Sequence, residues 1–414
     1  MREMIDSGIE WLHEIPSNWN CIKGKYFLKY LQRPTKEDDG VITCFRDGEV
    51  TLRSNRREDG FTVADKEIGY QGIDVGDLVV HGMDGFAGSI GISDSRGKAS
   101  PVLNVLDTNE NKRYIMYYLR SMAYTDVFLA LATGIRVRSC DLRWNKLAEL
   151  SYPIPPKSEQ KRIVSFLDTK CAEIDALVAD IQSQIDTLEQ YKRSVITETV
   201  TKGLNPDVEM KDSGIQWIGM MPSHWDCIRG KYILKYIQKP VCEDDGVITC
   251  FRDGEVTLRS NRREDGFTMA DKEIGYQGID IGDLVVHGMD GFAGAIGISD
   301  SRGKASPVLN VLGTEQNKRY IMYFLRSMAY SDVFVALATG IRVRSCDLRW
   351  NKLAELFYPV PPLEEQDTIV AHIDSVLQKT NDVIADKKKQ LTVLENYKKS
   401  LIYEYVTGKK VVPM

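Results

Sequence analysis

Gly40-Val-Ile-Thr-Cys-Phe-Arg46 returns unchanged as Gly246-Val-Ile-Thr-Cys-Phe-Arg252. The same shift of 206 residues aligns residues 133–143 with residues 339–349, and it needs no gap from Met4 to the end of the chain. Because solenoid repeats have periods of roughly 20–50 residues, a period of this length indicates two duplicated domains. Two equal domains present two equal binding surfaces, which suggests a ligand that is itself two-fold.

The two copies match unevenly along their length. Between residues 40 and 150 they differ at nine positions, most of them conservative: Val63/Met269, Val75/Ile281, Ser89/Ala295, Asp107/Gly313, Asn109/Glu315, Glu110/Gln316, Tyr118/Phe324, Thr125/Ser331 and Leu129/Val335. After Pro156 and Pro362 the copies diverge. Either the first segment was copied recently, or both copies must do one identical job while the tails need only keep a pattern.

The composition is that of an ordinary globular protein with two or three domains. The chain has 414 residues, of which 43% are apolar and 27% charged. No apolar run approaches the roughly 18–20 residues of a membrane span, and the first residues carry no apolar signal core. None of the eight cysteines forms a C-x-x-C pair, which favours a reducing compartment over a disulfide scaffold. We therefore expect a cytoplasmic protein without a metal site.

The net charge of −5 argues mildly against nucleic-acid binding, since such proteins usually run basic. Local segments differ from this average. Residues 112–146 hold seven basic side chains against Asp126 and Asp141, and four arginines cluster between residues 46 and 57. Composition neither proves nor excludes a DNA ligand.

Each half begins with a segment that reads as a compact α/β domain. Short β-like runs at residues 40–45, 49–52, 76–81 and 89–93 are separated by Asp-Gly pairs, which signal turns. Helical spacing of the apolar residues predicts a helix over residues 111–132. We expect globular domains over residues 1–155 and 206–361.

A long helix is predicted after each domain. Proline-rich segments at residues 152–156 and 361–362 precede runs whose apolar residues alternate at spacings of four and three, a heptad seam. The seam residues are Ile174, Val178, Ile181, Ile185, Leu188 and Val195 in the first helix, and Ile373, Leu377, Ile384, Leu391, Leu394 and Leu401 in the second. Gly203 and Gly408 end the helices, and Lys387 replaces Ile181 at one layer. We expect a central spacer helix within 156–205 and a C-terminal one within 362–414.

A lone heptad helix must bury its apolar stripe, and the nearest partner is the other helix of the same chain. Packed side by side, the second helix must run back along the first. This predicts two domains held apart by two long antiparallel coiled-coil helices, with pseudo-two-fold symmetry. Pairing of the heptads with another molecule is the alternative.

Enzyme motifs are weak. Glycines between residues 82 and 88 lack the Lys-Ser/Thr of a P-loop and sit between strands, so they read as turn glycines. His81 with Asp84 suggests general-base chemistry, although a histidine at a strand end is more often structural. Residues 206–211 hold the residue types of a metal nuclease site but lie in a linker and have no second copy. The chain is therefore expected to be non-catalytic.

A DNA-binding hypothesis fits the residues better. Arginine grips guanine and asparagine grips adenine with paired hydrogen bonds, while serine and threonine serve phosphates. The candidate contacts in the first half are Arg46, Arg53, Asn55, Arg56, Arg57, His81, Thr133, Arg136, Arg138 and Arg143. Their mates are Arg252, Arg259, Asn261, Arg262, Arg263, His287, Thr339, Arg342, Arg344 and Arg349. The alternative is that these arginines pair with nearby carboxylates as a solvated surface, but loops repeated almost verbatim favour function.

These features resemble the specificity subunit of type I restriction-modification systems over nearly the whole chain. The most specific marks are Asp6-Ser-Gly-Ile-Glu-Trp-Leu-His-Glu-Ile-Pro16 with Trp19, and Asp212-Ser-Gly-Ile-Gln-Trp217 with Pro222 and Trp225. Residues 76–80 and 133–136 fit looser patterns of the family. Residues 155–164 and 361–370 are similar to the segments that begin its spacer helices.

The resemblance implies two target-recognition domains, each reading half of a bipartite DNA site. It also implies two modification subunits that carry S-adenosylmethionine and methylate adenine N6, and a restriction subunit that uses ATP and magnesium. This chain itself would hold no cofactor. Because its two domains nearly match, we expect a palindromic target with one half-site inverted about a nonspecific spacer. A fused methyltransferase or nuclease and a protein-binding coiled-coil scaffold are the alternatives.

Replacing Arg136 and Arg342 together by alanine is expected to weaken DNA binding without unfolding the chain, because both are predicted to lie at the DNA. Filter retention of duplex DNA measures the binding, and a thermal unfolding curve checks the fold. Unchanged binding would place the contact surface elsewhere.

Overall fold

The computed structural model describes residues 2–56, 68–130, 142–262, 274–337 and 348–413. The chain divides into two compact units, Met1–Ile181 with Lys388–Met414 and Gln182–Lys387. Each unit holds one copy of the globular domain and part of each long helix. The domain bounds expected from the sequence stay a prediction.

The first unit begins with a globular domain of short strands and helices. Its elements are β1 (Met4–Asp6), β2 (Glu14–Pro16), β3 (Asn20–Lys23), η1 (Gly24–Tyr26), β4 (Leu28–Leu31), β5 (Ile42–Cys44), β6 (Val50–Leu52), η2 (Arg53–Asn55), β7 (Gln71–Ile73), β8 (Leu78–His81), η3 (Gly85–Ala87), β9 (Ile90–Ile92), β10 (Gly97–Ala99), β11 (Leu103–Thr108), α1 (Lys112–Tyr124), α2 (Val127–Ala130), α3 (Trp144–Glu149) and β12 (Ser151–Ile154). The strands predicted from the four β-like runs are confirmed as β5, β6, β8 and β9.

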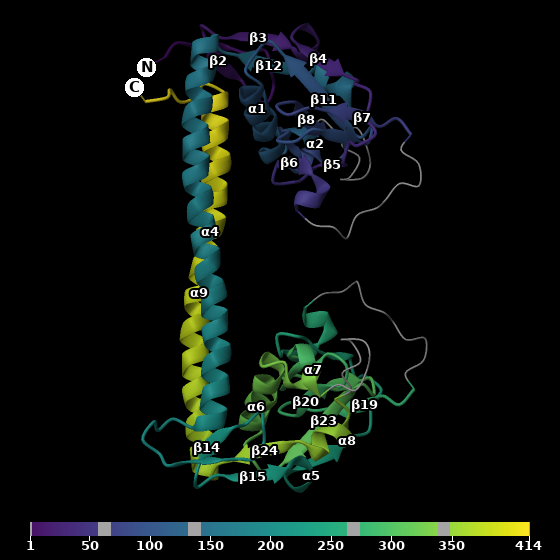
Figure 1. Cartoon of the computed structure of the whole chain (residues 1–414), viewed down its shortest axis with the longest axis vertical. Coiled ribbons are helices and arrows are strands. Elements are labelled where there is room, and N and C mark those ends of the chain that lie inside the picture. The colour runs from purple at the N-terminus through teal and green to yellow at the C-terminus, as the bar shows by residue number, and fades with distance from the viewer. Residues whose placement is uncertain (1, 57–67, 131–141, 263–273, 338–347, 414) are drawn as a thin grey trace. The chain divides into compact units, whose positions relative to one another are not determined.

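A four-stranded antiparallel sheet in the order β4-β11-β8-β9 organises this domain, and Figure 1 labels β4, β11 and β8 of it. Side chains alternate across it, as the two-residue period of a strand requires. Leu78, Val80 and Leu106 join the core that α1 covers. Val79 and Val105 join a separate cluster formed with the β5–β6 hairpin and the antiparallel pair of β7 and β10. The sheet is therefore buried on both faces.

The helix predicted over residues 111–132 is broken in two, so that prediction was wrong in its continuity. Asn111 caps α1, because its side chain accepts hydrogen bonds from the backbone amides of Arg113 and Tyr114. The helix stops at Tyr124, and Asp126 adopts a left-handed φ of 56° before α2 begins. A left-handed residue cannot continue an α-helix, and the apolar spacing does not reveal it. Residues 131 and 132 lie outside the described residues.

The two long helices are α4 (Lys157–Lys202) and α9 (Leu363–Val406), as predicted. Gly203 and Gly408 follow them with φ of 76° and 73°, a conformation that favours glycine. In the first unit, Phe166 of α4 packs on Tyr405 of α9 with ring centroids 4.5 Å apart, and Asp175 pairs with Lys398. Early residues of α4 thus meet late residues of α9, so the helices are antiparallel there.

The second unit shows the same antiparallel pairing. Ile196 and Val200 of α4 share a core with Ile369 and Ile373 of α9. Lys387, which was expected to interrupt the heptad seam, donates a hydrogen bond to the Gln184 side chain. The charged side chain at this position of the seam therefore has a hydrogen-bond acceptor on the opposite helix.

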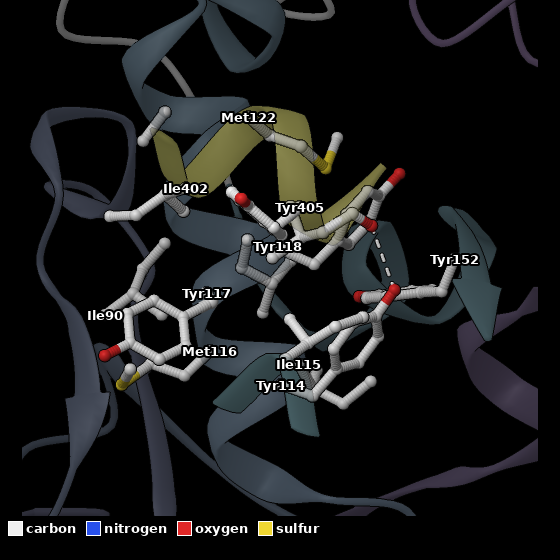
Figure 2. Close-up of a cluster of buried hydrophobic side chains, with 14 of the residues drawn as sticks. Ile90, Tyr114, Ile115, Met116, Tyr117, Tyr118, Met122, Tyr152, Ile402 and Tyr405 are labelled. Carbon is white, nitrogen blue, oxygen red and sulfur yellow. Dashed lines mark hydrogen bonds between the residues drawn. The ribbon is translucent and has the colours of Figure 1, made fainter. Parts of the chain in front are cut away.

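The C-terminal end of α9 completes the core of the first domain. Ile402 and Val406 are fully buried with Tyr114 and Ile115 of α1. Figure 2 shows Tyr114, Tyr118 and Met122 gathered beside Ile402 and Tyr405. The Tyr114 hydroxyl lies 2.8 Å from the Pro153 carbonyl and 2.9 Å from the Val406 carbonyl, and it can donate to one of them at a time. Burial raises the pKa of Tyr114, so the hydroxyl keeps its proton.

The globular domain of the second unit repeats the first. Its elements are β13 (Met210–Asp212), β14 (Met220–Pro222), β15 (Asp226–Arg229), α5 (Gly230–Ile233), β16 (Leu234–Ile237), β17 (Ile248–Cys250), β18 (Val256–Leu258), η4 (Arg259–Asn261), β19 (Gln277–Ile279), β20 (Leu284–His287), η5 (Gly291–Ala293), β21 (Ile296–Ile298), β22 (Gly303–Ala305), β23 (Leu309–Thr314), α6 (Lys318–Tyr330), α7 (Val333–Ala336), α8 (Trp350–Glu355) and β24 (Phe357–Val360). Here the Tyr320 hydroxyl lies 3.0 Å from the Val200 carbonyl of α4 and 3.1 Å from the Pro359 carbonyl.

Two classes of feature are missing from the part of the chain that the structure describes. No helix within the described ranges combines the length and the apolarity that crossing a membrane requires. Nor do the described residues include a group of three or more His, Cys, Asp or Glu side chains able to hold a metal ion.

Replacing Tyr114 and Tyr320 by phenylalanine is expected to lower the free energy of unfolding by about 1–3 kcal/mol at each site, because a buried carbonyl of a helix end loses its donor. Chemical denaturation of the full chain measures the change. Tyr26→Phe is the control, since Tyr26 is 73% exposed and should leave stability unaltered. If Tyr114→Phe and Tyr320→Phe were as stable as the control Tyr26→Phe, the role given to the two buried hydroxyls would be contradicted.

Candidate nucleic-acid interface

Three of the sequence-predicted residues converge on the loop that joins β8 to β9, residues 82–89. His81 ends β8 and begins this loop. Arg46 lies beside this loop. Its carbonyl oxygen is so close to Gly88 that a Cβ atom added to Gly88 would lie only 2.7 Å from it. Arg143 lies on the other side, where the Leu142 amide donates to the Gly82 carbonyl at 2.8 Å. We call Arg46, His81 and Arg143 the first reading surface.

His81 is held as a neutral ring with a fixed tautomer. Its Nδ1 accepts hydrogen bonds from the backbone amides of Met83 at 3.2 Å and Asp84 at 2.9 Å. Since amides only donate, Nδ1 carries no proton, and the ring proton resides on Nε2. Burial lowers the pKa of His81, and Asp84, whose Oδ2 is 3.9 Å from Nε2, only partly opposes that effect. The ring can present one hydrogen-bond donor and no positive charge at neutral pH.

Arg46 stands at the turn of the β5–β6 hairpin, 70% exposed, with its guanidinium 3.1 Å from Asp84. Arg120 of α1 holds this turn in place. Its Nη2 donates to the Asp47 carbonyl and would collide with any Cβ on Gly48, at 1.4 Å. The Asp-Gly pair that signals the turn is therefore also what allows the arginine to pass. The helix fixes the turn, and the turn presents Arg46.

The other predicted contacts of this hairpin are engaged within it. Arg53 donates to Thr43 Oγ1 at 3.3 Å, and Asn55 donates to Thr51 Oγ1 at 2.8 Å. Arg56 lies over the Phe45 ring at 4.2 Å and pairs with Asp47 at 2.7 Å. This is the carboxylate pairing considered as the alternative to DNA contact, and a role for these residues at DNA stays a prediction.

The second unit repeats this geometry closely. Arg252 lies 2.9 Å from Asp290, and His287 Nδ1 accepts from Met289 at 3.2 Å and from Asp290 at 2.9 Å. Arg259, Asn261 and Arg262 keep the partners of their mates, namely Thr249, Thr257 and Asp253 with Phe251. We call Arg252, His287 and Arg349 the second reading surface.

Comparisons with known proteins show similarity to one kind of protein, the specificity subunits of type I restriction enzymes. The chain is 24% identical over 421 residues to the type I restriction enzyme MjaVIII specificity subunit of Methanocaldococcus jannaschii, covering 95% of this chain and 93% of that relative. It is 25% identical over 455 residues to the type I restriction enzyme EcoBI specificity subunit of Escherichia coli, covering 98% and 89%. No family model matches the chain.

One solved structure comes from a study of how the type I restriction-modification system assembles and changes conformation. It contains a chain of the same fold. The TM-score is 0.68 at 13% identity, covering 96% of this chain and 99% of that one. Over nearly its whole length the chain is thus similar in sequence to type I specificity subunits, and it shares the fold of a chain from such a system. The resemblance drawn from residues 6–16 and 155–164 is confirmed, as is the fold expected from it.

Eight of the DNA contacts predicted for this chain lie outside the described residues. They are Arg57, Thr133, Arg136, Arg138, Arg263, Thr339, Arg342 and Arg344. The segment that holds Thr133, Arg136 and Arg138 is followed directly by Leu142 and Arg143, beside the loop that follows β8.

Sequence reasoning missed two features of this surface. Arg120 was counted only as one of the basic residues of 112–146, although it and its mate Arg326 anchor the hairpin turns through the Asp47 and Asp253 carbonyls. No local pattern pairs a helix residue with a distant turn. Met83 and Met289 project from the loops at 56% and 57% exposure. The sequence signal that could have predicted their exposure is their position in a glycine-containing loop, between a histidine and an aspartate.

We expect the rings of His81 and His287 to titrate below pH 6.5, with the proton on Nε2 at higher pH. Lowered folded-state pKa values mean that this contribution to stability is complete above about pH 6.5 and is lost as the pH falls below it. Nitrogen-15 NMR of the ring nitrogens measures both properties, and five histidines make the spectrum tractable. His81→Gln and His287→Gln assign the signals. A midpoint above 6.5 would refute the neutral ring.

Proposed function

We propose that this specificity subunit binds double-stranded DNA and reads one short half-site with each of its two reading surfaces. The observation that carries the proposal is the identity of the two surfaces in three dimensions. The same arginine, histidine and glycine loop recur with the same partners, and their distances agree to within 0.2 Å. Scaffolds tolerate variation in exposed loops, so equal loops in both units argue for equal ligands.

The chemistry of the reading surface suits a duplex. An exposed arginine such as Arg46 can donate to guanine O6 and N7, and the Nε2–H of a neutral histidine can donate to a purine acceptor in the major groove. Asp84 holds the Arg46 guanidinium before DNA arrives, which reduces the entropy lost on binding. Because the two surfaces are alike, the target is a palindrome, with the half-site inverted about a spacer.

The same proposal includes a non-catalytic role within a larger complex. Two modification subunits bring S-adenosylmethionine and methylate adenine N6, and a restriction subunit brings ATP and magnesium. Matched apolar residues on the long helices support two equivalent partner sites. In the first unit, about half of the surface of Leu177 and of Tyr397 is exposed. In the second unit, their repeat mates Val383 and Tyr191 are exposed to a similar extent. Exposed apolar groups at equal positions are typical of interaction surfaces.

The palindrome is tested with duplexes built from the methylated adenine motif mapped in the host genome. A duplex with inverted half-sites should bind at least about a hundredfold more tightly than one with direct half-sites. A reversed half-site mismatches several base pairs, and each mismatch costs about 1–3 kcal/mol. Equal affinity for the two duplexes would refute the palindromic reading.

Two controls separate this function from its rivals. The purified chain alone, incubated with S-adenosylmethionine and the inverted duplex, should transfer no methyl group, whereas a fused methyltransferase would. Retention of DNA should fall steeply as salt rises, because phosphate contacts release counterions. A protein-binding scaffold would retain no DNA at any salt concentration.

A further inference from the structure

A cleft separates the helix pair from the globular domain in the second unit. Its volume is about 850 Å³. Lys192 and Arg193 of α4 line one wall, together with Asn381 of α9. Arg252 of the second reading surface and Arg326, which anchors its hairpin, line the other. The cleft therefore continues from the proposed DNA surface onto the long helices.

The first unit has the same cleft, but a salt bridge crosses it. Two cavities of about 310 and 600 Å³ occupy the equivalent space, and Asp175 and Lys398 line both. The Lys398 ammonium lies 2.6 and 2.7 Å from the two carboxylate oxygens of Asp175. Arg46 of the first reading surface lines the larger cavity, beside Lys399. The pair joins α4 to α9 across the floor of the cleft.

The repeat explains the difference between the two clefts. Lys192 and Arg193 are the repeat mates of Lys398 and Lys399, so positive charge is kept at both positions although the helices have otherwise diverged. Asn381 is the mate of Asp175 and brings no charge. Lys192 instead pairs with Glu189 of its own helix at 2.9 Å. An ion pair three residues apart on a helix surface contributes little to stability, which leaves Lys192 available to an incoming anion.

A second cation of each cleft is held against an aromatic ring. Arg193 lies over Tyr330 at 5.3 Å from the ring centroid, and Lys399 lies over Tyr124 at 5.9 Å. Arg193 and Lys399 are both exposed. A ring face orients a cation without neutralising it, so the full charge remains for a ligand. Each cleft thus presents two helix cations next to the arginine of a reading surface.

We propose that the long helices contact the phosphodiester backbone of the DNA beside each half-site, through Lys192 and Arg193 in the second unit and through Lys398 and Lys399 in the first. The inference rests on the proposed DNA-binding function. The two contacts are unequal although the two reading surfaces are alike. Asp175 neutralises Lys398 and repels a phosphate, whereas Asn381 does neither. The helices therefore act as more than spacers, and the complex with a symmetric target is electrostatically asymmetric.

Two reciprocal substitutions in the full chain test the proposal. Asp175→Asn makes the first cleft like the second, and Asn381→Asp makes the second like the first. The readout is the slope of log affinity against log salt for a duplex with inverted half-sites and for a scrambled duplex of equal length. One phosphate contact changes this slope by about 0.9. We expect a steeper slope by that amount for D175N and a shallower one for N381D, on both duplexes.

Matched controls remove the effect of net charge. Glu173→Gln deletes the same charge two residues from Asp175, where Glu173 pairs only along its own helix with Lys170. Ser194→Asp adds the same charge to α4 two residues from Lys192, at an exposed position that does not line the cleft. Both controls should leave the slope unchanged, and thermal unfolding should show all four variants folded.

The outcomes separate this inference from the function on which it rests. Unchanged slopes for D175N and N381D, with tight binding of the inverted duplex retained, would overturn the helix contact and leave the proposed function standing. Slopes that shift equally in the controls would also overturn it, since bulk charge would then be the cause. Failure of the unaltered chain to prefer the inverted duplex would overturn the proposed function itself.

Discussion

The burial of one helix end in each globular domain is the interaction on which the rest of the structure depends. Val406 of α9 and Val200 of α4 are fully buried, and a buried tyrosine hydroxyl, of Tyr114 or Tyr320, lies at the carbonyl of each. Without the helix end, the apolar side of α1 or α6 would face water. Burying side chains of this size contributes about 1.5–3 kcal/mol each, far more than the exposed ion pairs along the helices.

The same helix links that core to the reading surface. One side of α1 carries Tyr114 and Ile115 into the core, and from the helix Arg120 reaches the turn that presents Arg46. The loop after β8 is fixed in turn by the His81 ring, which binds two amides of the loop it precedes. Contacts with the helix and the loop therefore hold the turn that presents Arg46 and the ring of His81 before any ligand binds, which reduces the order that must be gained at these two residues on binding.

Identical recognition does not require identical surroundings. The arginine–aspartate distances of the two reading surfaces agree to within 0.2 Å, yet the clefts beside these surfaces differ in charge because one position holds Asp175 in one unit and Asn381 in the other. The two domains are nearly identical along residues 40–150 and 246–356, whereas the two long helices differ at most positions while keeping the heptad pattern and single residues such as Lys192 and its mate Lys398. A long helix tolerates such change because its exposed positions contribute little to stability.

Periodicity was enough to predict the duplication and the two long helices, and the direction of the chain predicted their antiparallel pairing. Of the four-stranded sheet, the sequence pattern predicted β8 and β9 but not β4 and β11. It missed the break at Asp126, because a single left-handed residue leaves the apolar spacing intact. It placed Arg56 and Arg46 in one basic cluster, and only the tertiary structure showed Arg56 stacked on Phe45 while Arg46 stays exposed. Likewise, only the tertiary structure showed which groups Arg120, Tyr114 and Asp175 contact, namely the carbonyls of Asp47 and Val406 and the Lys398 ammonium. A sequence pattern reports which side of an element is buried, but partners far apart in the chain meet only when the elements pack.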